Sequence, residues 1–456
     1  MSISTIAEWV DGELSHGRPG AEVDSVCTDS RALKPSNPAG PGALFVALRG
    51  ENFDGHDFIR QAAQAGAAGA MVEQAPVDFS PECALIRVGD TLAALQRMAA
   101  SYRRTLSMKV INITGSNGKT STKDFTAAVL AVRGRVAKTV GNLNNHIGLP
   151  LTILRASAGD AFGVFEIGMN HPGEIAPLTR ISRPDAGVIT NIGLAHIEFM
   201  GSAEAIAQEK GLLAEAVGAD GFVVLPVDDA FTESIAARTH AKVIRAGLDH
   251  GDVFASDLKS DSEGSRFVVH ARGRTAEGQV TAPGRHMVRN AMLAVAVGLE
   301  YGLALEECME GLRGAKLTGG RLERKMVRGI CILDDSYNAN PDSMVAALET
   351  LGQMPGRRIA VLGQMNELGV ESDRGHQRVG QAAAREKIDC LITVGGVASG
   401  IASAAREYGV KHTLTPDTTA EAAAILRSMA RNGDTVLIKG SRSVKMETIV
   451  EELARL

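Results

Sequence analysis

The sequence predicts an α/β protein of three domains, in which a small N-terminal α/β domain precedes two domains built on mainly parallel sheets. Two observations predict this class. Short apolar runs of strand length alternate with segments of helical periodicity, which is typical of a parallel sheet covered by helices on both faces. Many of the 50 glycines directly follow such runs, where α/β proteins place phosphate-binding turns. The length of 456 residues accommodates two to four domains of about 100–200 residues each.

The composition excludes several classes of function. Hydrophobic residues make up 45% of the chain, so each domain can bury a core. The net charge of −5 provides no overall basic field for nucleic acid or an anionic membrane. No apolar run reaches the roughly 18 residues of a membrane span, and the N-terminal segment lacks the apolar region of a signal peptide. The five cysteines lack metal-site spacing and predict reduced thiols in a cytoplasmic protein.

The first region spans residues 1–106. The apolar run 43–48 has the length of a strand. A helix is predicted to begin at Thr91, because the apolar residues that follow recur at helical spacing on one face. The segment from Lys34 to Gly42 is rich in Pro, Gly, Ser and Asn and predicts a loop, whose contacts stay open.

The second region spans residues 107–319, and the basic segment 103–109 marks the boundary before it. Strands are predicted at 110–113, 163–167, 187–190 and 222–225. A helix is predicted from Ala203 to Val217. The alternation of strands and helices favours a mainly parallel sheet with helices on both faces.

The third region spans residues 320–456 and repeats the α/β pattern after a glycine-containing basic segment, 316–324. Its predicted strands are 330–333, 359–362, 390–394 and 435–438. Three of them are followed closely by Gly363, Gly395 or Gly440. We therefore predict a second doubly wound, Rossmann-like sheet with ligand loops at the carboxyl ends of its strands.

The sharpest local signal is Thr114-Gly115-Ser116-Asn117-Gly118-Lys119-Thr120, between a predicted strand and a predicted helix. Backbone N–H groups of such a loop form a cradle for phosphate. Lys119 is predicted to reach the β- and γ-phosphates, and the Thr120 hydroxyl to bind Mg²⁺. The loop is shorter than the standard phosphate loop, and a tight turn with a solvated lysine is the alternative. A kinase, a switch ATPase and a ligase could all use such a loop.

Two side chains elsewhere in the second region, Glu166 and His196, are candidates for a metal site. Glu166 lies inside an apolar strand, where a carboxylate is costly unless it is paired or bound to a metal; a structural acid is the alternative. His196 follows the carboxyl end of another strand, where ligands gather, although a lone histidine is usually structural or solvated. Lys210, considered by itself, is an exposed helical lysine.

Together these motifs resemble the Mur ligase family over essentially the whole chain, in the family's order. The loop 114–120 is similar to the family's T-G-[ST]-N-G-K-T. The run 141–150, which reads G-N-L-N-N-H-I-G-L-P, resembles the MurF form of a family loop. The run 334–341, D-D-S-Y-N-A-N-P, resembles the family's [DH]-D-x-Y-N-A-N-P block. The D-N-P-R motif of the MurE branch is missing from the sequence. The long proline-rich loop at 32–42, and Val227 where asparagine is common, depart from the family pattern.

The resemblance implies three sets of site residues. Its UDP-substrate site comprises Thr28, Asp29, Ser30, Arg31, Phe45, Ala47, Gly55, His56, Asn142, Asn144 and Asn145. Its ATP site comprises residues 115–120 with Ser121, Asn290, Arg321, Asp335, Tyr337 and Asn338. Its metal site comprises Thr120, Glu166, His196 and Lys210, the last as a carbamate. Lys119, His196 and Lys210 are the implied catalytic residues.

The resemblance further implies a reaction. An ATP- and Mg²⁺-dependent ligase of this branch joins D-alanyl-D-alanine to UDP-N-acetylmuramoyl-tripeptide through an acyl phosphate, in peptidoglycan precursor synthesis. No nucleic acid or membrane partner is expected, and a monomer is the default. Two alternatives stay open: a sister ligase of the MurE or folylpolyglutamate synthase type, and a regulatory or assembly ATPase that forms no bond.

Overall fold

The computed structural model describes residues 1–17, 19–33, 41–74, 83–261 and 263–455, so most of the predicted loop at 34–42 lies outside the described residues. The chain divides into two compact units. The first comprises Met1–Asn112, Arg135–Ile167 and Ala176–Pro184. The second comprises Ile113–Gly134, Gly168–Ile175 and Asp185–Leu456.

The N-terminal sheet has the strand order β1-β5-β4-β3-β2. Its strands are β1 Glu13–His16, β2 Val23–Cys27, β3 Gly42–Val46, β4 Gly69–Val72 and β5 Ala84–Arg87, with helices α1 Ile3–Val10, α2 Ile59–Gln64 and α3 Thr91–Thr105. Strands β2 to β5 pair in parallel, and β1 is antiparallel to β5. Helix α3 begins at the predicted residue because the Asp90 carboxylate accepts a hydrogen bond from Ala93 N, 2.9 Å away, and caps the helix.

The central sheet has the strand order β14-β13-β12-β11-β10-β9-β6-β8-β7. Its strands are β6 Lys109–Thr114, β7 Val136–Lys138, β8 Phe162–Glu166, β9 Ala186–Ile189, β10 Phe222–Pro226, β11 Lys242–Leu248, β12 Val253–Asp261, β13 Gly264–Ala271 and β14 Arg274–Val280. Its helices are α4 Lys119–Leu130, α5 Gly148–Leu154, α6 Ile175–Ser182, α7 Ile197–Met200, α8 Ala203–Ala216, α9 Thr232–Ala236, α10 Arg285–Glu300 and α11 Leu305–Arg313. The four predicted strands are confirmed as β6, β8, β9 and β10, and their ends shift by one residue.

Strands β12 to β14 form an antiparallel extension that the sequence did not reveal. In β12 the first and third residues are buried, whereas the rest of the strand is exposed or half-buried. Strand β14 is exposed over most of its length. Strands of this kind carry no continuous apolar run, and such a run was the signal that predicted the parallel strands.

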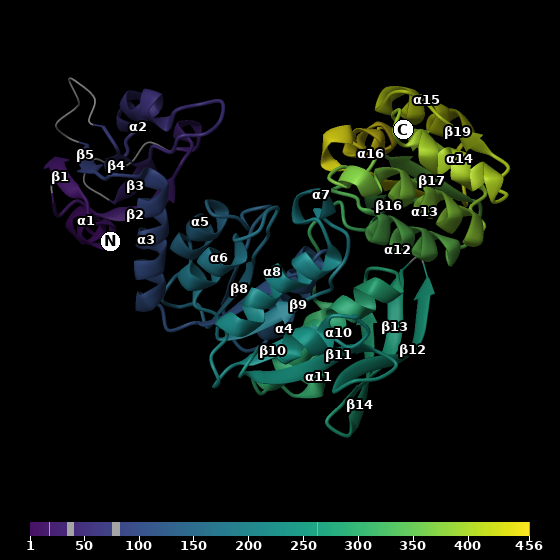
Figure 1. Ribbon diagram of the computed structural model, residues 1–456, viewed down its shortest axis with the longest axis horizontal. Coiled ribbons are helices and arrows are strands. Elements are labelled where there is room, and N and C mark those ends of the chain that lie inside the picture. Colours follow the sequence, from purple (N-terminus) through teal and green to yellow (C-terminus); the bar gives the residue numbers. More distant parts are fainter. Residues whose placement is uncertain (18, 34–40, 75–82, 262, 456) are drawn as a thin grey trace. The chain divides into compact units, whose positions relative to one another are not determined.

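The C-terminal sheet has the strand order β15-β16-β20-β17-β18-β19. Its strands are β15 Glu323–Val327, β16 Ile330–Asp335, β17 Arg358–Gly363, β18 Cys390–Val394, β19 Thr413–Leu414 and β20 Thr435–Lys439. Its helices are α12 Pro341–Gly352, α13 Ser372–Arg385, α14 Ser399–Glu407, α15 Thr419–Met429 and α16 Glu447–Ala454. Helices α12 and α13 cover one face of the sheet, and α15 and α16 cover the other (Figure 1). All four predicted strands are confirmed, and only β15 is antiparallel to its neighbour.

The carboxyl ends of the parallel strands β16, β20 and β17 meet at one edge of this sheet. At that edge Gly440 and Gly363 approach so closely that a Cβ on Gly440 would lie 3.0 Å from Gly363 Cα. Lys439, the last residue of β20, donates to the carboxylate of Asp335, the last residue of β16, at 2.6 Å. The sheet therefore gathers polar side chains at the edge where ligands were predicted.

Two predictions from composition can be compared with the structure. All five cysteines are free thiols, and four of them are buried. Among the residues that the structure describes, no helix is both long and apolar enough to cross a membrane.

Candidate nucleotide and ligation site

The loop 114–120 connects β6 to α4, as predicted. Two of its glycines have backbone conformations that only glycine adopts readily, with φ of 147° at Gly115 and 79° at Gly118. A Cβ on Gly115 would lie 1.9 Å from Thr190 Oγ1, and a Cβ on Gly118 would lie 2.6 Å from Asn290 Oδ1. The loop can adopt this conformation because glycine occupies the two positions at which Thr190 and Asn290 pack directly against its backbone.

The segment after β9 holds the first half of the loop. Ser116 N donates to Asn191 O at 2.9 Å, and Asn117 N donates to Asn191 Oδ1 at 2.8 Å. Gly193 N donates to Ser116 Oγ at 2.8 Å. Two of the amides expected to form the phosphate cradle are thus bonded within the protein, so a phosphate is expected at the first turn of α4, where helical N–H groups lack intrahelical partners. Asn191 was not among the predicted site residues, although it follows the predicted strand 187–190 directly.

Lys119 folds over the loop. Its Nζ donates to Gly115 O at 2.7 Å and to Ser116 O at 3.4 Å, and the residue is half-buried. This geometry argues against a solvated lysine, the alternative left open by the sequence. The cation stands at the strand-to-helix turn, where a positive charge attracts phosphate.

Two asparagines from other segments contact the same loop. Asn290, on α10, is buried and packs against Gly118. Asn340, at the N-terminus of α12, donates from Nδ2 to Asn117 Oδ1 at 2.7 Å. Asn340 was not among the predicted site residues, although it lies in the D-D-S-Y-N-A-N-P run. Among the described residues, Asn117 Nδ2 is buried with no hydrogen-bond partner, so the loop keeps a donor for a ligand.

Lys210 is not the exposed helical lysine that its local sequence suggests. Its side chain on α8 is buried, with 1% of its surface exposed, and that interpretation is wrong. Burial lowers the pKa of Lys210 well below its usual value, and the charge of Lys119 lowers it further, whereas Glu209 opposes both. Glu209 is itself fixed, because its carboxylate accepts from Gly173 N at 2.9 Å and Ile175 N at 2.8 Å. Burial and the nearby cation therefore favour a neutral amine at Lys210.

His196 begins α7 with a left-handed backbone, φ 64°. Its Nδ1 lies 2.6 Å from Glu367 Oε2, and this hydrogen bond lowers the pKa of Glu367. The bond fixes the imidazole ring and leaves Nε2 for another ligand. Glu367 was not among the predicted site residues.

Glu166 ends β8 and is buried, with 3% of its surface exposed. Its Oε1 accepts from Asn144 Nδ2 at 2.8 Å, and its backbone N donates to Thr139 Oγ1 at 2.9 Å. Glu166 belongs to the first unit, whereas Thr120, His196 and Lys210 belong to the second. Among the described residues, no three His, Cys, Asp or Glu side chains cluster as metal ligands. The four-residue metal site therefore stays a prediction.

Arg321, which precedes the C-terminal sheet, contacts Tyr337, which follows Asp335 at the carboxyl end of β16. The Arg321 guanidinium carbon lies 4.3 Å from the centroid of the Tyr337 ring, a cation–π contact. Asp335 accepts from Leu322 N at 3.1 Å and from Lys439 Nζ at 2.6 Å, and Lys439 also donates to Asn338 O at 2.9 Å. Lys439 is 3% exposed and was not predicted as a site residue. Among the described residues, Arg321 Nε is buried without a hydrogen-bond partner.

The residues predicted for the UDP substrate are mostly engaged within the first unit. Arg31 donates to both carboxylate oxygens of Asp29 at 2.9 and 2.8 Å, which lowers the pKa of Asp29 to about 2. Ser30 Oγ donates to Gln61 at 3.2 Å. Phe45 and Ala47 are core residues, so their side chains are not available to a ligand. Thr28 and Asn142 are partly or fully exposed.

His56 and its neighbours show the same pattern. Glu73 N donates to His56 Nε2 at 3.0 Å, so Nδ1 carries the proton that is donated to Asp54 at 2.6 Å. Both ring nitrogens are therefore used. Gly55 has no room for a side chain, because a Cβ would lie 2.7 Å from Leu48 O. Asn145 Oδ1 accepts from Gly148 N, at the first residue of α5, over 2.9 Å.

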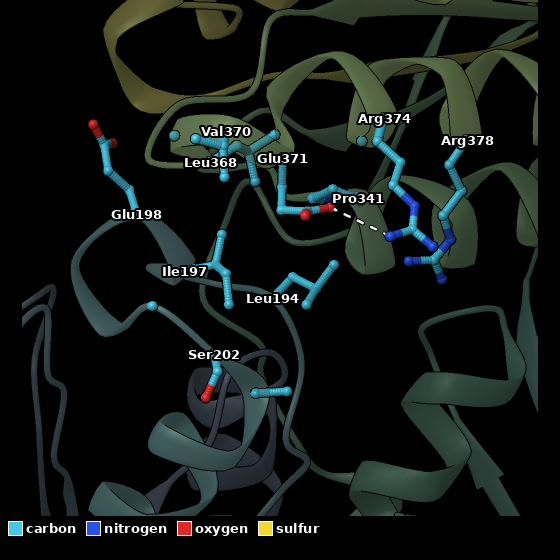
Figure 2. A pocket seen from close by; sticks show the side chains of 14 residues that line it. Leu194, Ile197, Glu198, Ser202, Pro341, Leu368, Val370, Glu371, Arg374 and Arg378 are labelled. Atoms are coloured by element: carbon cyan, nitrogen blue, oxygen red, sulfur yellow. Dashed lines mark ion pairs between the residues drawn. The ribbon is translucent and has the colours of Figure 1, made fainter.

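A pocket of about 750 Å³ is lined by residues of α7, α12 and α13 and of the segments that precede α7 and α13 (Figure 2). Leu194 and Pro341 line it, and each directly follows a residue that holds the phosphate loop, Gly193 or Asn340. Its other walls combine apolar and charged side chains, namely Ile197, Leu368 and Val370 with Glu198, Glu371, Arg374 and Arg378. The volume falls in the range of about 300–1,000 Å³ of small-ligand sites.

Comparisons with known proteins agree with this geometry. Residues 113–298 match the Mur ligase middle domain, residues 320–442 match the Mur ligase, glutamate ligase domain, and residues 22–103 match the Mur ligase family, catalytic domain. A Bacillus subtilis (strain 168) protein named UDP-N-acetylmuramoyl-tripeptide–D-alanyl-D-alanine ligase is 38% identical over 99% of this chain and 98% of its own length. The Escherichia coli (strain K12) protein of the same name is 36% identical, with the same coverage.

Solved structures give the same result. A crystal structure of MurF from Acinetobacter baumannii has a TM-score of 0.90 and 32% identity, covering 100% of this chain and 99% of that one. MurF ligase from Thermotoga maritima in complex with ADP has a TM-score of 0.84 and 27% identity, covering 94% and 97%. The predicted three-domain α/β fold is confirmed by these likenesses.

Proposed function

This chain belongs to the Mur ligase family, and from that premise we propose that it joins D-alanyl-D-alanine to UDP-N-acetylmuramoyl-tripeptide. ATP drives the reaction and is converted to ADP and phosphate. The observation that carries the proposal is full-length identity of 36–38% to ligases named for this reaction, together with an intact phosphate loop. The product is a precursor of peptidoglycan.

The chemistry explains why a nucleotide site and an amine site must be neighbours. A carboxylate is a poor electrophile, so its oxygen first attacks the γ-phosphorus of ATP, and the bond from that phosphorus to the β–γ bridging oxygen breaks to release ADP. The amine of the dipeptide then attacks the acyl carbon, a tetrahedral intermediate forms, and phosphate leaves as the amide bond closes. Positioning and charge stabilisation supply most of the acceleration. The pocket lined by Leu194 and Pro341, which follow the loop-contacting residues Gly193 and Asn340 in sequence, suits the incoming dipeptide.

ATP is expected to bind across the phosphate loop and the edge of the C-terminal sheet. Lys119, folded over the loop, is positioned to move onto the β- and γ-phosphates once they displace it from Gly115 O. The two buried donors without partners among the described residues, Asn117 Nδ2 and Arg321 Nε, fit an anionic ligand. Tyr337, Asn338 and Asn290 complete the proposed nucleotide site.

The residues proposed for Mg²⁺ fit a hard cation in chemistry. Glu166 offers a buried carboxylate and Thr120 a hydroxyl, and His196 Nε2 is left for a ligand by the bond of Nδ1 to Glu367. Lys210 cannot ligate as an ammonium, but its lowered pKa favours the neutral amine that reacts with CO₂ to give an anionic carbamate. Mg²⁺ would offset the repulsion between the phosphates and the substrate carboxylate.

We propose that three domains divide this work, with boundaries at residues 1–106, 107–319 and 320–456. The first holds the uridine end of the muramoyl nucleotide, with the polar residues near Asp29, His56 and Asn145. The second holds ATP, and the third brings its substrate-facing edge to the loop. Closure would exclude water, which otherwise hydrolyses the acyl phosphate. The free thiols and the ATP dependence favour the cytoplasm, and a monomer is the expected state.

One experiment tests the proposal. Phosphate release is measured with ATP, Mg²⁺, the muramoyl tripeptide nucleotide and D-alanyl-D-alanine, together and with each left out. Turnover is expected only with the complete set. Equal turnover with ATP alone would support an assembly or regulatory ATPase. Preference for a single amino acid over the dipeptide would support a sister ligase.

A further inference from the structure

The segment that leads from the central sheet into the C-terminal sheet is anchored on its N-terminal side by a buried carboxylate. Asp124, on the phosphate-loop helix α4, accepts hydrogen bonds from Thr318 N at 2.8 Å and Thr318 Oγ1 at 2.7 Å. Lys123 Nζ donates to the other oxygen of the same carboxylate at 2.9 Å. The Asp124 side chain is 0% exposed and the Lys123 side chain 2% exposed. Charged groups buried this deeply are costly unless they are paired and hydrogen-bonded, so the arrangement is a built contact.

The C-terminal side of the same segment is anchored to the other sheet. Tyr337 N donates to Gly320 O at 3.2 Å, and Leu322 N donates to Asp335 Oδ1 at 3.1 Å. The Arg321 guanidinium lies over the Tyr337 ring. Residues 320–322 therefore belong structurally to the end of β16, whereas Thr318 belongs to α4.

We propose that Asp124 is a positioning residue that ties the linker to the phosphate-loop helix and confines interdomain rotation to Gly319 and Gly320. Gly319 alone lies between Thr318 and the anchored segment 320–322, and the φ torsion of Gly320 precedes the carbonyl that accepts from Tyr337 N. Gly320 has a φ of 70°, a region that glycine enters without strain. Near Gly319, the only atoms that a Cβ would meet belong to the flexible carboxylate of Glu323. Both observations indicate that the backbone torsions of Gly319 and Gly320 can change with little steric hindrance.

The position of Asp124 on α4 explains why such an anchor serves the ligase reaction proposed above. Asp124 follows Thr120 by four residues, so it lies one helical turn along the same face. One turn of α4 thus connects the phosphate site to Asp124, which holds Thr318 next to the proposed site of rotation. Because Asp124 fixes the linker at Thr318, each rotation at the two glycines moves the C-terminal domain along the same path relative to the loop.

Thr318 is the residue at which to test the anchor, because replacing Asp124 would also remove the carboxylate that the buried Lys123 binds and could destabilise the fold. Thr318→Val keeps the shape and removes the hydroxyl donor, and Thr318→Ser restores the donor. Thr435→Val is the matched control, since it removes a buried hydroxyl bond to Pro355 O, 3.0 Å long, within the C-terminal domain. Spin labels at Glu310→Cys and Glu407→Cys, in a Cys27→Ser background, report the interdomain distance, because the other four cysteines are buried.

The distance distribution in the ligand-free protein is expected to broaden in Thr318→Val and to return to the wild-type width in Thr318→Ser. In turnover assays kcat/KM for D-alanyl-D-alanine is expected to fall about 10-fold in Thr318→Val, while affinity for a non-hydrolysable ATP analogue stays the same. Thr435→Val should change neither. A wild-type distribution in Thr318→Val, or equal broadening in Thr435→Val, would overturn the proposal. The distance readout needs no turnover, so it separates failure of the anchor from failure of the proposed function.

Discussion

Burial on helix α8 lowers the pKa of Lys210, and the charge of Lys119 lowers it further. One lysine stands over the phosphate loop as a cation, while the other is kept from the charged state by burial and by that cation. Two residues of the same type are thereby prepared for opposite chemistry, phosphate binding and formation of a carbamate.

A first prediction concerns the pH dependence of stability. Because the pKa of Lys210 is lowered in the folded state, the unfolded state binds more protons between that pKa and about 10.5, and stability rises with pH across this window. Lys210→Met is therefore expected to be more stable than the wild type at neutral pH, with a difference that disappears above about pH 10.5. Urea unfolding in CO₂-free, Mg²⁺-free buffer measures it. The exposed Lys411→Met is the control and should show no such trend; a pH-independent difference for Lys210→Met would contradict the lowered pKa.

A second prediction concerns the carbamate. Lys210→Ala is expected to be nearly inactive and to be partly rescued by a short-chain carboxylate such as acetate, which supplies the missing anionic oxygen. Lys210→Arg should also fail, because a guanidinium cannot carry the carbamate. Steady-state phosphate release measures both. Full activity of Lys210→Arg would remove Lys210 from the metal site.

A third prediction concerns Lys119→Ala. Loss of the cation at the β- and γ-phosphates is expected to lower kcat by on the order of 10²-fold or more. The loop should keep its shape, because Asn191 and Gly193 hold it through backbone atoms and the Ser116 hydroxyl. Thermal unfolding is therefore expected to stay close to wild type. Near-normal turnover would identify Lys119 as a bystander.

The sequence predicted those parts of the fold that contain continuous apolar runs. Strands β6, β8, β10, β16, β17, β18 and β20 are buried over most or all of their length, and each was predicted to within two residues. Strands β12 to β14 were missed because their exposed faces dilute the apolar signal. The phosphate loop could also be predicted, because the spacing of its glycines implies backbone conformations that other residues avoid.

The site could be predicted only where a residue type is unusual for its local position. Lys210 shows the limit, because burial depends on what packs over α8 and a helical lysine carries no mark of it. Glu367 is similar, since its partner His196 lies 171 residues away. Phe45 and Ala47 are the opposite case. Their motif predicted contact with a ligand, whereas the structure places their side chains in the core.

A fourth prediction concerns Gly115→Ala. The substitution forces a non-glycine residue to φ 147° and places a methyl group against Thr190 Oγ1, so we expect a loss of about 1–3 kcal/mol in the free energy of unfolding and weaker nucleotide binding. Urea unfolding and ATP-analogue titration measure the two effects. Gly218→Ala is the matched control, because a Cβ there meets nothing within 4 Å. Equal behaviour of the two variants would show that the loop tolerates another backbone conformation.

The last prediction concerns closure. Because Thr318 is tied to α4 and residues 320–322 to the end of β16, rotation at Gly319 can move the C-terminal domain away from the loop, which Asn340 contacts in this structure, and back to it without disturbing either core. Small-angle scattering is expected to show a smaller radius of gyration when an ATP analogue and the muramoyl nucleotide are both bound, because both ligands supply charges that the closed site must neutralise. Each ligand alone is the control and should give a smaller change. An unchanged radius with both ligands would mean that the site assembles without domain movement, and the reaction would then need another means of excluding water from the acyl phosphate.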